Sequence, residues 1–173
     1  MGNGASARIA LGIDPGTAIV GYAVIAARGD ELTMIACNVI TTPARMPLAE
    51  RFQHIYQRLI EIVKTYSPQE AAMEELFFAK NARTAMTVGQ ARGVAMLALA
   101  NGGLSISEYT PKQVKQAVTG YGDARKEQVG EMVRILLKLP SIPRPDDAAD
   151  AAAVAICHLN TASILTNHFL KLR

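Results

Sequence analysis

The first forty residues hold three short segments rich in isoleucine and valine, and turn-forming pairs separate them. The segments are residues 8–14, 19–26 and 31–40, with Pro15-Gly16 after the first and Gly29-Asp30 after the second. Apolar runs of this length, divided by such turns, are typical of strands joined by hairpins. We therefore expect the chain to begin with an antiparallel run of three strands.

Beyond residue 40, helical periodicity alternates with single strand-like segments. Apolar residues between Met46 and Tyr66 recur every three or four positions, which predicts an amphipathic helix that ends before Pro68. The remaining pattern predicts strands at 70–77 and 104–109, and helices at 81–100, 110–120, 125–137 and from about Asp147 onward. Three strands followed by alternating helices and strands predict an α/β fold, in which helices cover both faces of a mixed five-stranded sheet.

The length of 173 residues fits one domain, and the sequence contains no internal repeat and no low-complexity tract. We expect residues 1–7 to form a flexible extension, residues 8–160 the folded domain and residues 161–173 a C-terminal tail. No secretion signal and no apolar stretch of about 18 residues is present, so we expect no membrane association. Cys37 and Cys157 lie far apart in apolar runs, which favours buried thiols in a reducing cytoplasm over a disulfide framework or a zinc site.

Positive charge is concentrated in the middle of the chain, although the formal net charge is only +3. Residues 77–144 carry ten Lys and Arg against four Asp and Glu, so the rest of the chain is net acidic. A basic segment is a feature of nucleic-acid-binding proteins. A solvated helical surface would show the same asymmetry, so charge alone leaves both interpretations open.

Two carboxylate positions stand out because they end strongly apolar runs. Asp14 follows "IALGI", and Glu74 and Glu75 follow "AAM" in the strand expected at 70–77. Burying an ionised carboxylate without a partner is costly, so such residues usually face a cation or a functional site. For Asp14 the alternative is a simple turn, because Asp-Pro-Gly forms turns whatever the function of the chain. Alternation along a buried strand does not decide between Glu74 and Glu75.

A further pair, Asp147 and Asp150, stands at the start of the last predicted helix. The spacing of three places both carboxylates on one helix face, within reach of a common ligand. The alternative is helix capping, since acidic residues in the first turn favour the helix dipole, and Asp146 is also a candidate for the cap. The alanines beside the pair would let this helix end lie close to a sheet that carries the other carboxylates: Ala148, Ala149, Ala151, Ala152 and Ala153.

Four carboxylates in one place would repel one another, and hard divalent cations such as Mg2+ are the natural way to hold them together. Two such ions can activate a water and stabilise the leaving oxygen of a phosphodiester. No serine or cysteine nucleophile stands out beside a histidine, and we expect His54, His158 and His168 to pack or to lie on the surface. The acidic residues therefore favour metal-dependent nuclease chemistry.

Four blocks of the sequence, in this order and at these separations, closely resemble the RuvC family of bacterial Holliday-junction resolvases. They cover nearly the whole chain: "LGIDPGTAIVGYAVI" at 11–25, "MEELFFAKNARTAMTVGQARGVA" at 73–95, "YTPKQVKQAVTGYGDARKEQV" at 109–129 and "DDAADAAAVAICH" at 146–158. The resemblance implies an RNase H-like nuclease domain, and a homodimer that nicks two opposed strands of four-way junction DNA symmetrically in recombination and repair. Docking of branch-migration proteins of the RuvA and RuvB type is a further partner that the resemblance raises.

The resemblance also implies the roles of individual residues. The catalytic, metal-binding tetrad falls on Asp14, Glu74, Asp147 and Asp150, with two Mg2+ ions per active site or Mn2+ as a substitute. The proline-rich linker is one residue longer than the family pattern, so Asp146 remains an alternative to Asp147.

For DNA binding, Phe77 matches an aromatic residue that stacks on exposed bases, an interaction worth about 1–3 kcal/mol per base. The alternative for Phe77 is a core phenylalanine. Matching basic residues flank the strand-exchange point (Lys80, Arg83 and Arg92) or approach the scissile phosphate (Lys115 and Lys126).

Other classes of function share part of these features. The segment Asp14–Thr17 also resembles the phosphate loop of actin-like and sugar-kinase phosphotransferases, but that architecture needs two lobes and this chain supplies one. A non-catalytic junction-binding scaffold would keep the fold and the basic surface, and the presence of all four acids argues against it. Related nucleases that cut ribosomal RNA precursors share the first motif and remain an alternative.

Overall fold

The computed structural model describes residues 6–75 and 82–170, and its centre is a mixed five-stranded sheet. The strand order is β3-β2-β1-β4-β5, in which β1, β2 and β3 pair antiparallel and β4 and β5 run parallel to β1. The strands are β1 (Arg8–Asp14), β2 (Ile19–Arg28), β3 (Glu31–Thr41), β4 (Glu70–Glu74) and β5 (Ser105–Tyr109). The predicted mixed sheet and its opening antiparallel run are confirmed.

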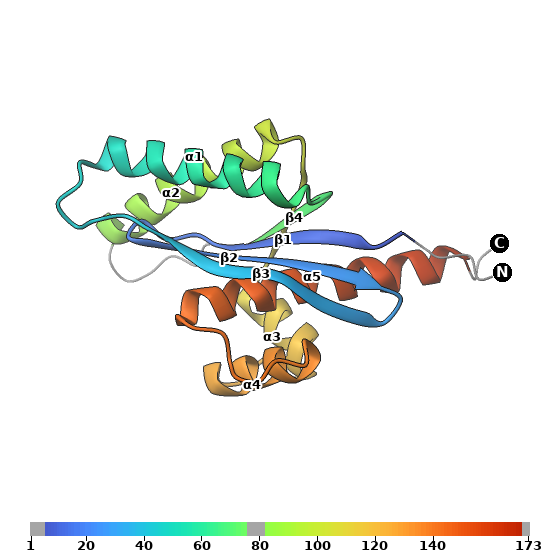
Figure 1. Ribbon diagram of the computed structural model, residues 1–173. Coiled ribbons are helices and arrows are strands. Elements are labelled where there is room, and N and C mark those ends of the chain that lie inside the picture. The colour runs from blue at the N-terminus through green and yellow to red at the C-terminus, as the bar shows by residue number, and fades with distance from the viewer. Residues whose placement is uncertain (1–5, 76–81, 171–173) are drawn as a thin grey trace.

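Helices cover both faces of this sheet, as the sequence predicts (Figure 1). One layer consists of α1 (Leu48–Tyr66) and α2 (Ala82–Asn101), and the other of α3 (Pro111–Thr119), α4 (Lys126–Leu136) and α5 (Asp146–Leu170). Among the described helices, none combines the length and the hydropathy that crossing a bilayer requires.

Several element boundaries differ from the sequence-based expectation, among them those of β4, β2 and α5. The strand β4 ends at Glu74, although a strand is predicted at 70–77, and residues 76 and 77 lie outside the described residues. The strand β2 runs two residues further than expected, to Arg28. The helix α5 begins at Asp146 and continues to Leu170, through most of the range assigned to a tail, because no Gly or Pro interrupts it.

Large aliphatic side chains fill the space between the sheet and the α1–α2 layer. They include Leu11, Ile13, Val24, Ile55, Leu59, Met73 and Leu99, all of them fully buried. The opposite face of the sheet meets α5 through much smaller side chains, with Ala151, Ala152 and Ala155 fully buried there. The helices on the two faces therefore lie at different distances from the sheet.

Two glycines in the strands allow α5 to lie against the sheet. A Cβ atom at Gly12 would lie 2.1 Å from the carbonyl oxygen of Ala151, and one at Gly21 would lie 1.9 Å from the carbonyl oxygen of Asp147. Side chains cannot be added at such separations without moving the helix. Gly21 also pairs with Asp14 in the β1–β2 register, so it brings the first turn of α5 to the end of β1.

A polar network holds the middle of α5 to the sheet, away from its first turn. Arg8 donates two hydrogen bonds to Glu70, at 2.9 and 2.7 Å, and the Nε2 atom of His158 lies 2.6 Å from Glu70 Oε2. The Nδ1 atom of the same histidine lies 2.9 Å from the hydroxyl of Tyr109. His158 is only 5% exposed, so of the two places expected for it, packed or on the surface, it takes the first.

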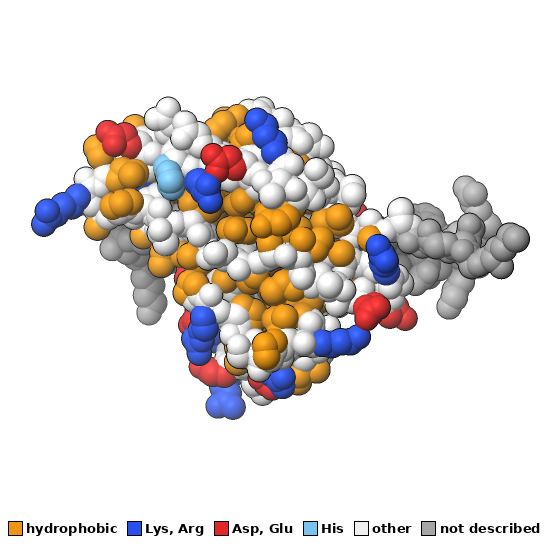
Figure 2. Space-filling model, viewed as in Figure 1, with side chains coloured by type: hydrophobic (Ala, Val, Ile, Leu, Met, Phe, Trp, Pro, Cys, Tyr) orange, Lys and Arg blue, Asp and Glu red, His pale blue; other side chains and the backbone are white. Residues whose placement is uncertain are grey.

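The side of the molecule seen in Figure 1, where β2 and β3 lie in front, does not carry one sign of charge. Figure 2 shows hydrophobic side chains gathered across the middle of this face, and Lys, Arg, Asp and Glu side chains interspersed around them. Ile35 of β3 is 44% exposed. No uniformly basic surface is visible on this face of the described chain.

Candidate active site

The structure brings Asp14 and Glu74 to the same edge of the sheet. Asp14 is the last residue of β1 and Glu74 the last of β4. These strands are parallel neighbours whose register pairs Ile13 with Met73, so the next residue of each strand lies at the same end. Both carboxylates are partly buried, whereas Glu75 is exposed and its N–H donates to the carbonyl of Tyr109. This difference favours Glu74 over Glu75 as the site residue.

The helix α5 adds Asp147 and Asp150 to this edge. Asp147 lies in the first turn, with its carbonyl against Gly21, and Asp150 follows one turn later. Asp146 is the exposed first residue of the helix and forms an ion pair with Arg144. That glycines in β1 and β2 allow this approach was not predicted from the sequence. An isolated glycine in an apolar strand is the signal that would have indicated a close backbone contact.

The other three predicted carboxylates lie near enough to Asp14 to affect its ionisation. The pKa of Asp14 is raised to about 7, first by burial and then by the charges of Asp150, Glu74 and Asp147 in that order of size, while Lys126 acts in the opposite direction. Burial also raises the pKa of Glu74, followed by the charge of Asp150, while Lys115 and Lys126 act in the opposite direction. Carboxylates that oppose one another's ionisation in this way form a site that favours a cation.

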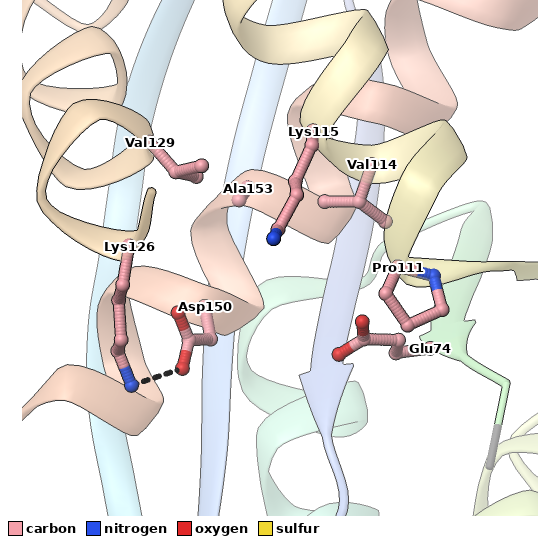
Figure 3. A pocket seen from close by; sticks show the side chains of 8 residues that line it. All are labelled: Glu74, Pro111, Val114, Lys115, Lys126, Val129, Asp150 and Ala153. Atoms are coloured by element: carbon pink, nitrogen blue, oxygen red, sulfur yellow. Dashed lines mark hydrogen bonds and ion pairs between the residues drawn. The ribbon is translucent and has the colours of Figure 1, made fainter. Parts of the chain in front are cut away.

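A cavity of about 250 Å³ opens beside these carboxylates, between α3, α4 and α5 (Figure 3). Figure 3 shows Lys115 of α3 and Glu74 pointing into it, and Lys126 of α4 joined to Asp150. The residues that line it are Glu74, Pro111, Val114, Lys115, Lys126, Val129, Asp150 and Ala153. Two carboxylates and two ammonium groups thus share one opening with an apolar wall.

Lys126 forms ion pairs with two aspartates at the site. Its Nζ atom lies 2.8 Å from Asp150 Oδ2 and 3.7 Å from Asp146 Oδ2. The lysine side chain is 55% exposed, and that of Asp150 is 33% exposed. The pKa of Lys126 is raised above its ordinary value, first by the hydrogen bond to Asp150.

The four carboxylates supply only oxygen donors, which suit hard divalent cations such as Mg2+ and Mn2+. In the part of the chain that the structure describes, no three His, Cys, Asp or Glu side chains lie close enough to hold one metal ion together. The oxygen donors and the repulsion between them fit a divalent cation. The carboxylates lie farther apart than direct coordination of one ion by three of them requires.

The other predicted DNA-binding residues have different surroundings. Phe77 and Lys80 lie outside the described residues, and Arg83 lies at the start of α2. Arg92 of α2 forms an ion pair with Glu108, its side chain is 16% exposed, and its Nε atom is buried without a hydrogen-bond partner. Of the six predicted DNA-binding residues, the structure brings Lys115 and Lys126 to the carboxylates.

Comparison with known proteins finds relatives over most of the chain. The family model for the crossover junction endodeoxyribonuclease RuvC matches residues 10–158. The chain is 56% identical over 156 residues to the crossover junction endodeoxyribonuclease RuvC of Chloroflexus aggregans, covering 90% of this chain and 95% of the relative. It is 57% identical over 149 residues to the protein of the same name from Heliobacterium modesticaldum, covering 86% of this chain and 92% of the relative.

Two solved structures extend the comparison. Thermus thermophilus RuvC in complex with a Holliday junction substrate superimposes with a TM-score of 0.88, at 37% identity, over 92% of this chain and 97% of that one. The yeast mitochondrial Holliday junction resolvase superimposes with a TM-score of 0.67 at 15% identity, over 95% of this chain and 86% of that one. The second likeness concerns the fold alone.

Proposed function

The chain belongs to the RuvC family of crossover junction endodeoxyribonucleases, and from this premise we propose that it resolves Holliday junctions by nicking two opposed strands symmetrically. The observation that carries the proposal is that the charges of Glu74, Asp147 and Asp150 all act on the partly buried carboxylate of Asp14, beside a cavity lined by two lysines. We propose that these four carboxylates bind two Mg2+ ions, which Mn2+ can replace, and that hydrolysis of a DNA phosphodiester takes place beside them.

The residues of this chain perform the steps that surround the hydrolysis. Divalent cations, when bound, would activate a water and stabilise the leaving oxygen. Asp14 and Glu74 come from strands and Asp147 and Asp150 from a helix that lies directly against them, so the backbone that carries the oxygen donors is in place before DNA arrives. The ammonium groups of Lys115 and Lys126 offset the charge of the scissile phosphate and hold it in register. Arg83, Lys80 and Phe77 contact the junction centre in this proposal, and Arg92 lies on the same helix as Arg83.

A cleavage assay on a synthetic four-way junction and a matched linear duplex tests this function. We expect paired nicks in the junction with Mg2+ or Mn2+, and none with a chelator. Cleavage that survives chelation would remove the metal assignment, and tight binding without nicking under any of these conditions would favour the scaffold alternative.

The variant Asp14→Asn gives the sharpest form of that test. It removes a charged ligand and leaves the basic surface intact, so cleavage should fall at least about a hundredfold while junction binding stays within about twofold. Both quantities follow from gel-based cleavage and fluorescence anisotropy on the same junction. Normal cleavage by this variant would contradict the tetrad.

We also propose that the protein acts as a homodimer, since two active sites are needed to nick two strands symmetrically. One face of α2 supports this: Met86 is 68% and Leu97 55% exposed, three helical turns apart, and a Cβ built at Gly93 between them would meet nothing within 4 Å in the described residues beyond its chain neighbours and the adjacent backbone of its own helix. An exposed apolar stripe with a glycine at its centre suits close packing against a second helix.

Light scattering tests the dimer through Leu97→Glu. We expect this variant to fold normally and to behave as a monomer at micromolar concentration, while Ile135→Glu on α4, which is also exposed, stays dimeric. A dimer that survives Leu97→Glu would place the interface elsewhere. Docking of RuvA and RuvB type proteins remains an expectation of the family resemblance.

A cytoplasmic location is the remaining part of the proposal. Its support is the DNA substrate of the family together with the two free thiols. Burial raises the pKa values of both Cys37 and Cys157 to about 11, which leaves them as unreactive thiols.

A further inference from the structure

Asp146 is an acidic residue beside the site that the proposed function leaves without a role. It is exposed at the start of α5, it pairs with Arg144, and one of its oxygens lies 3.7 Å from the ammonium of Lys126. That ammonium is also 2.8 Å from Asp150. One cation therefore stands between a proposed metal ligand and a carboxylate outside the proposed tetrad.

The geometry of α5 explains why both carboxylates reach the same lysine. Asp146 and Asp150 are four residues apart, so they lie on one face of the helix, one turn from each other. Lys126 is the first residue of α4, and more than half of its side chain is exposed. The ammonium can thus move between the two carboxylates by side-chain rotation, without a change in either helix.

A divalent cation bound at Asp150 changes the balance between these two partners. Two cations on one carboxylate repel each other across a few ångströms, so an ion at Asp150 disfavours the ammonium there. Asp146 is the second carboxylate with which Lys126 forms an ion pair. Lys126, Asp146 and Asp150 together line a second open cavity beside the first, so an ammonium held by Asp146 stays close to Asp150 and accessible to a DNA phosphate.

We propose that Lys126 is the counterion of Asp150 in the metal-free protein, and that Asp146 is a positioning residue that receives this ammonium when Asp150 binds a divalent cation. The inference rests on the proposed function, because it takes Asp150 as a metal ligand. It assigns Asp146 to the lysine and not to the metal, and it makes Lys126 a competitor of the metal until DNA provides a phosphate.

Isothermal titration calorimetry with Mn2+ on the full chain, without DNA, measures this competition directly. We expect Lys126→Gln to tighten Mn2+ binding about three- to tenfold, because the competing ammonium is gone. Asp146→Asn should weaken binding about threefold, because Lys126 then has only Asp150 as a partner. Asp146→Glu keeps the acceptor and should stay within about twofold of the parent protein.

A double-mutant cycle separates a role through Lys126 from direct coordination. With Lys126→Gln in place, the effect of Asp146→Asn should fall below about 1.5-fold, since there is no ammonium left to receive. The matched control is Lys115→Gln, which removes a lysine of the same cavity for which the described contacts show no ion pair with either aspartate. In that background the threefold effect of Asp146→Asn should persist.

The outcomes separate this inference from the proposed function. An equal loss on Asp146→Asn with and without Lys126 would make Asp146 a direct ligand and overturn the inference, as would unchanged or weaker Mn2+ binding by Lys126→Gln. Asp14→Asn in the same titration tests the site itself. An unchanged affinity for Mn2+ in this variant would overturn the proposed metal site. All the substituted residues except Asp14 are largely exposed or line the open cavity, and thermal unfolding would verify that each variant is folded.

Discussion

The two helical layers pack on the sheet in different ways, although they cover two faces of the same five strands. Between the sheet and the α1–α2 layer lie large aliphatic side chains such as Leu59, Ile55 and Met73. On the other face the backbone of α5 approaches the glycines of β1 and β2 directly. The α1–α2 layer gains its stability from buried apolar area. On the other face, the backbone of α5 lies unusually close to that of β1 and β2.

This difference explains where the candidate site lies. Carboxylate side chains are short, so those of a helix and of a strand reach a common ligand only if the backbones are near each other. A helix spaced from the sheet by leucines would hold Asp147 and Asp150 too far from Asp14. The alanines of α5 and the glycines at 12 and 21 therefore serve the geometry of the site as much as the packing of the core.

The change Gly21→Ala should disrupt the contact between α5 and the sheet, and we expect it to have the largest effect of the changes considered. Its Cβ atom would lie 1.9 Å from the carbonyl oxygen of Asp147, so the first turn of α5 must move away from Asp14. We expect a loss of about 3 kcal/mol in the free energy of unfolding, typical of strong overpacking, together with at least a hundredfold loss of junction cleavage. Chemical denaturation and cleavage at saturating Mg2+ measure the two effects. Cleavage at the parental rate would show that the helix position does not control the site.

The change Leu59→Ala tests the other layer in the complementary way. Leu59 is fully buried in the α1–α2 layer, and truncation of such a residue costs about 2–5 kcal/mol through lost burial and the cavity left behind. We expect a similar loss of stability to that of Gly21→Ala but an unchanged cleavage rate per folded molecule. A large fall in that rate at a temperature where the variant is folded would mean that the two layers are not independent.

The contrast between the layers also shows what the sequence can predict. The order of the elements followed from apolar runs, turn pairs and helical periodicity, which are local signals. Asp14 and Glu74 stood out because each follows an apolar stretch, and Asp147 and Asp150 stood out because their spacing places both on one face of a predicted helix. Even so, grouping Asp14, Glu74, Asp147 and Asp150 depended on the family resemblance, since spacing alone left turn formation and helix capping open.

Contacts between distant segments were out of reach of those local signals. The choice between Asp146 and Asp147 depends on which carboxylate faces β1, and this is set by the contact of α5 with Gly21. The hydrogen bonds of His158 link three elements that are far apart in the chain, so the sequence left open whether the histidine packs or lies on the surface. The end of β4 is a local boundary of the kind that propensities place within a few residues.

Glu70→Gln should have the smallest effect, and it asks whether the polar network matters to the site. Glu70 begins β4, at the opposite end of the strand from Glu74, and binds Arg8 and His158. The hydrogen bond from Arg8 lowers the pKa of Glu70 below its ordinary value of 4.5. A carboxylate whose pKa is lowered by folding stabilises the protein above its unfolded pKa, and this contribution is lost as the pH falls through the folded value.

We therefore expect Glu70→Gln to cost about 1–2 kcal/mol at pH 7, because a charge-assisted pair that is partly exposed contributes no more than this. The difference from the parent protein should shrink as the pH is lowered below 4.5, which denaturation curves across the acidic range would measure. Cleavage at pH 7 should be unchanged, because the close contact at Gly21, and not this network, sets the position of the first turn of α5. A stability difference that stays constant with pH would show that the charge of Glu70 is not what holds this part of α5, and a loss of cleavage would extend the control of the site along the whole helix.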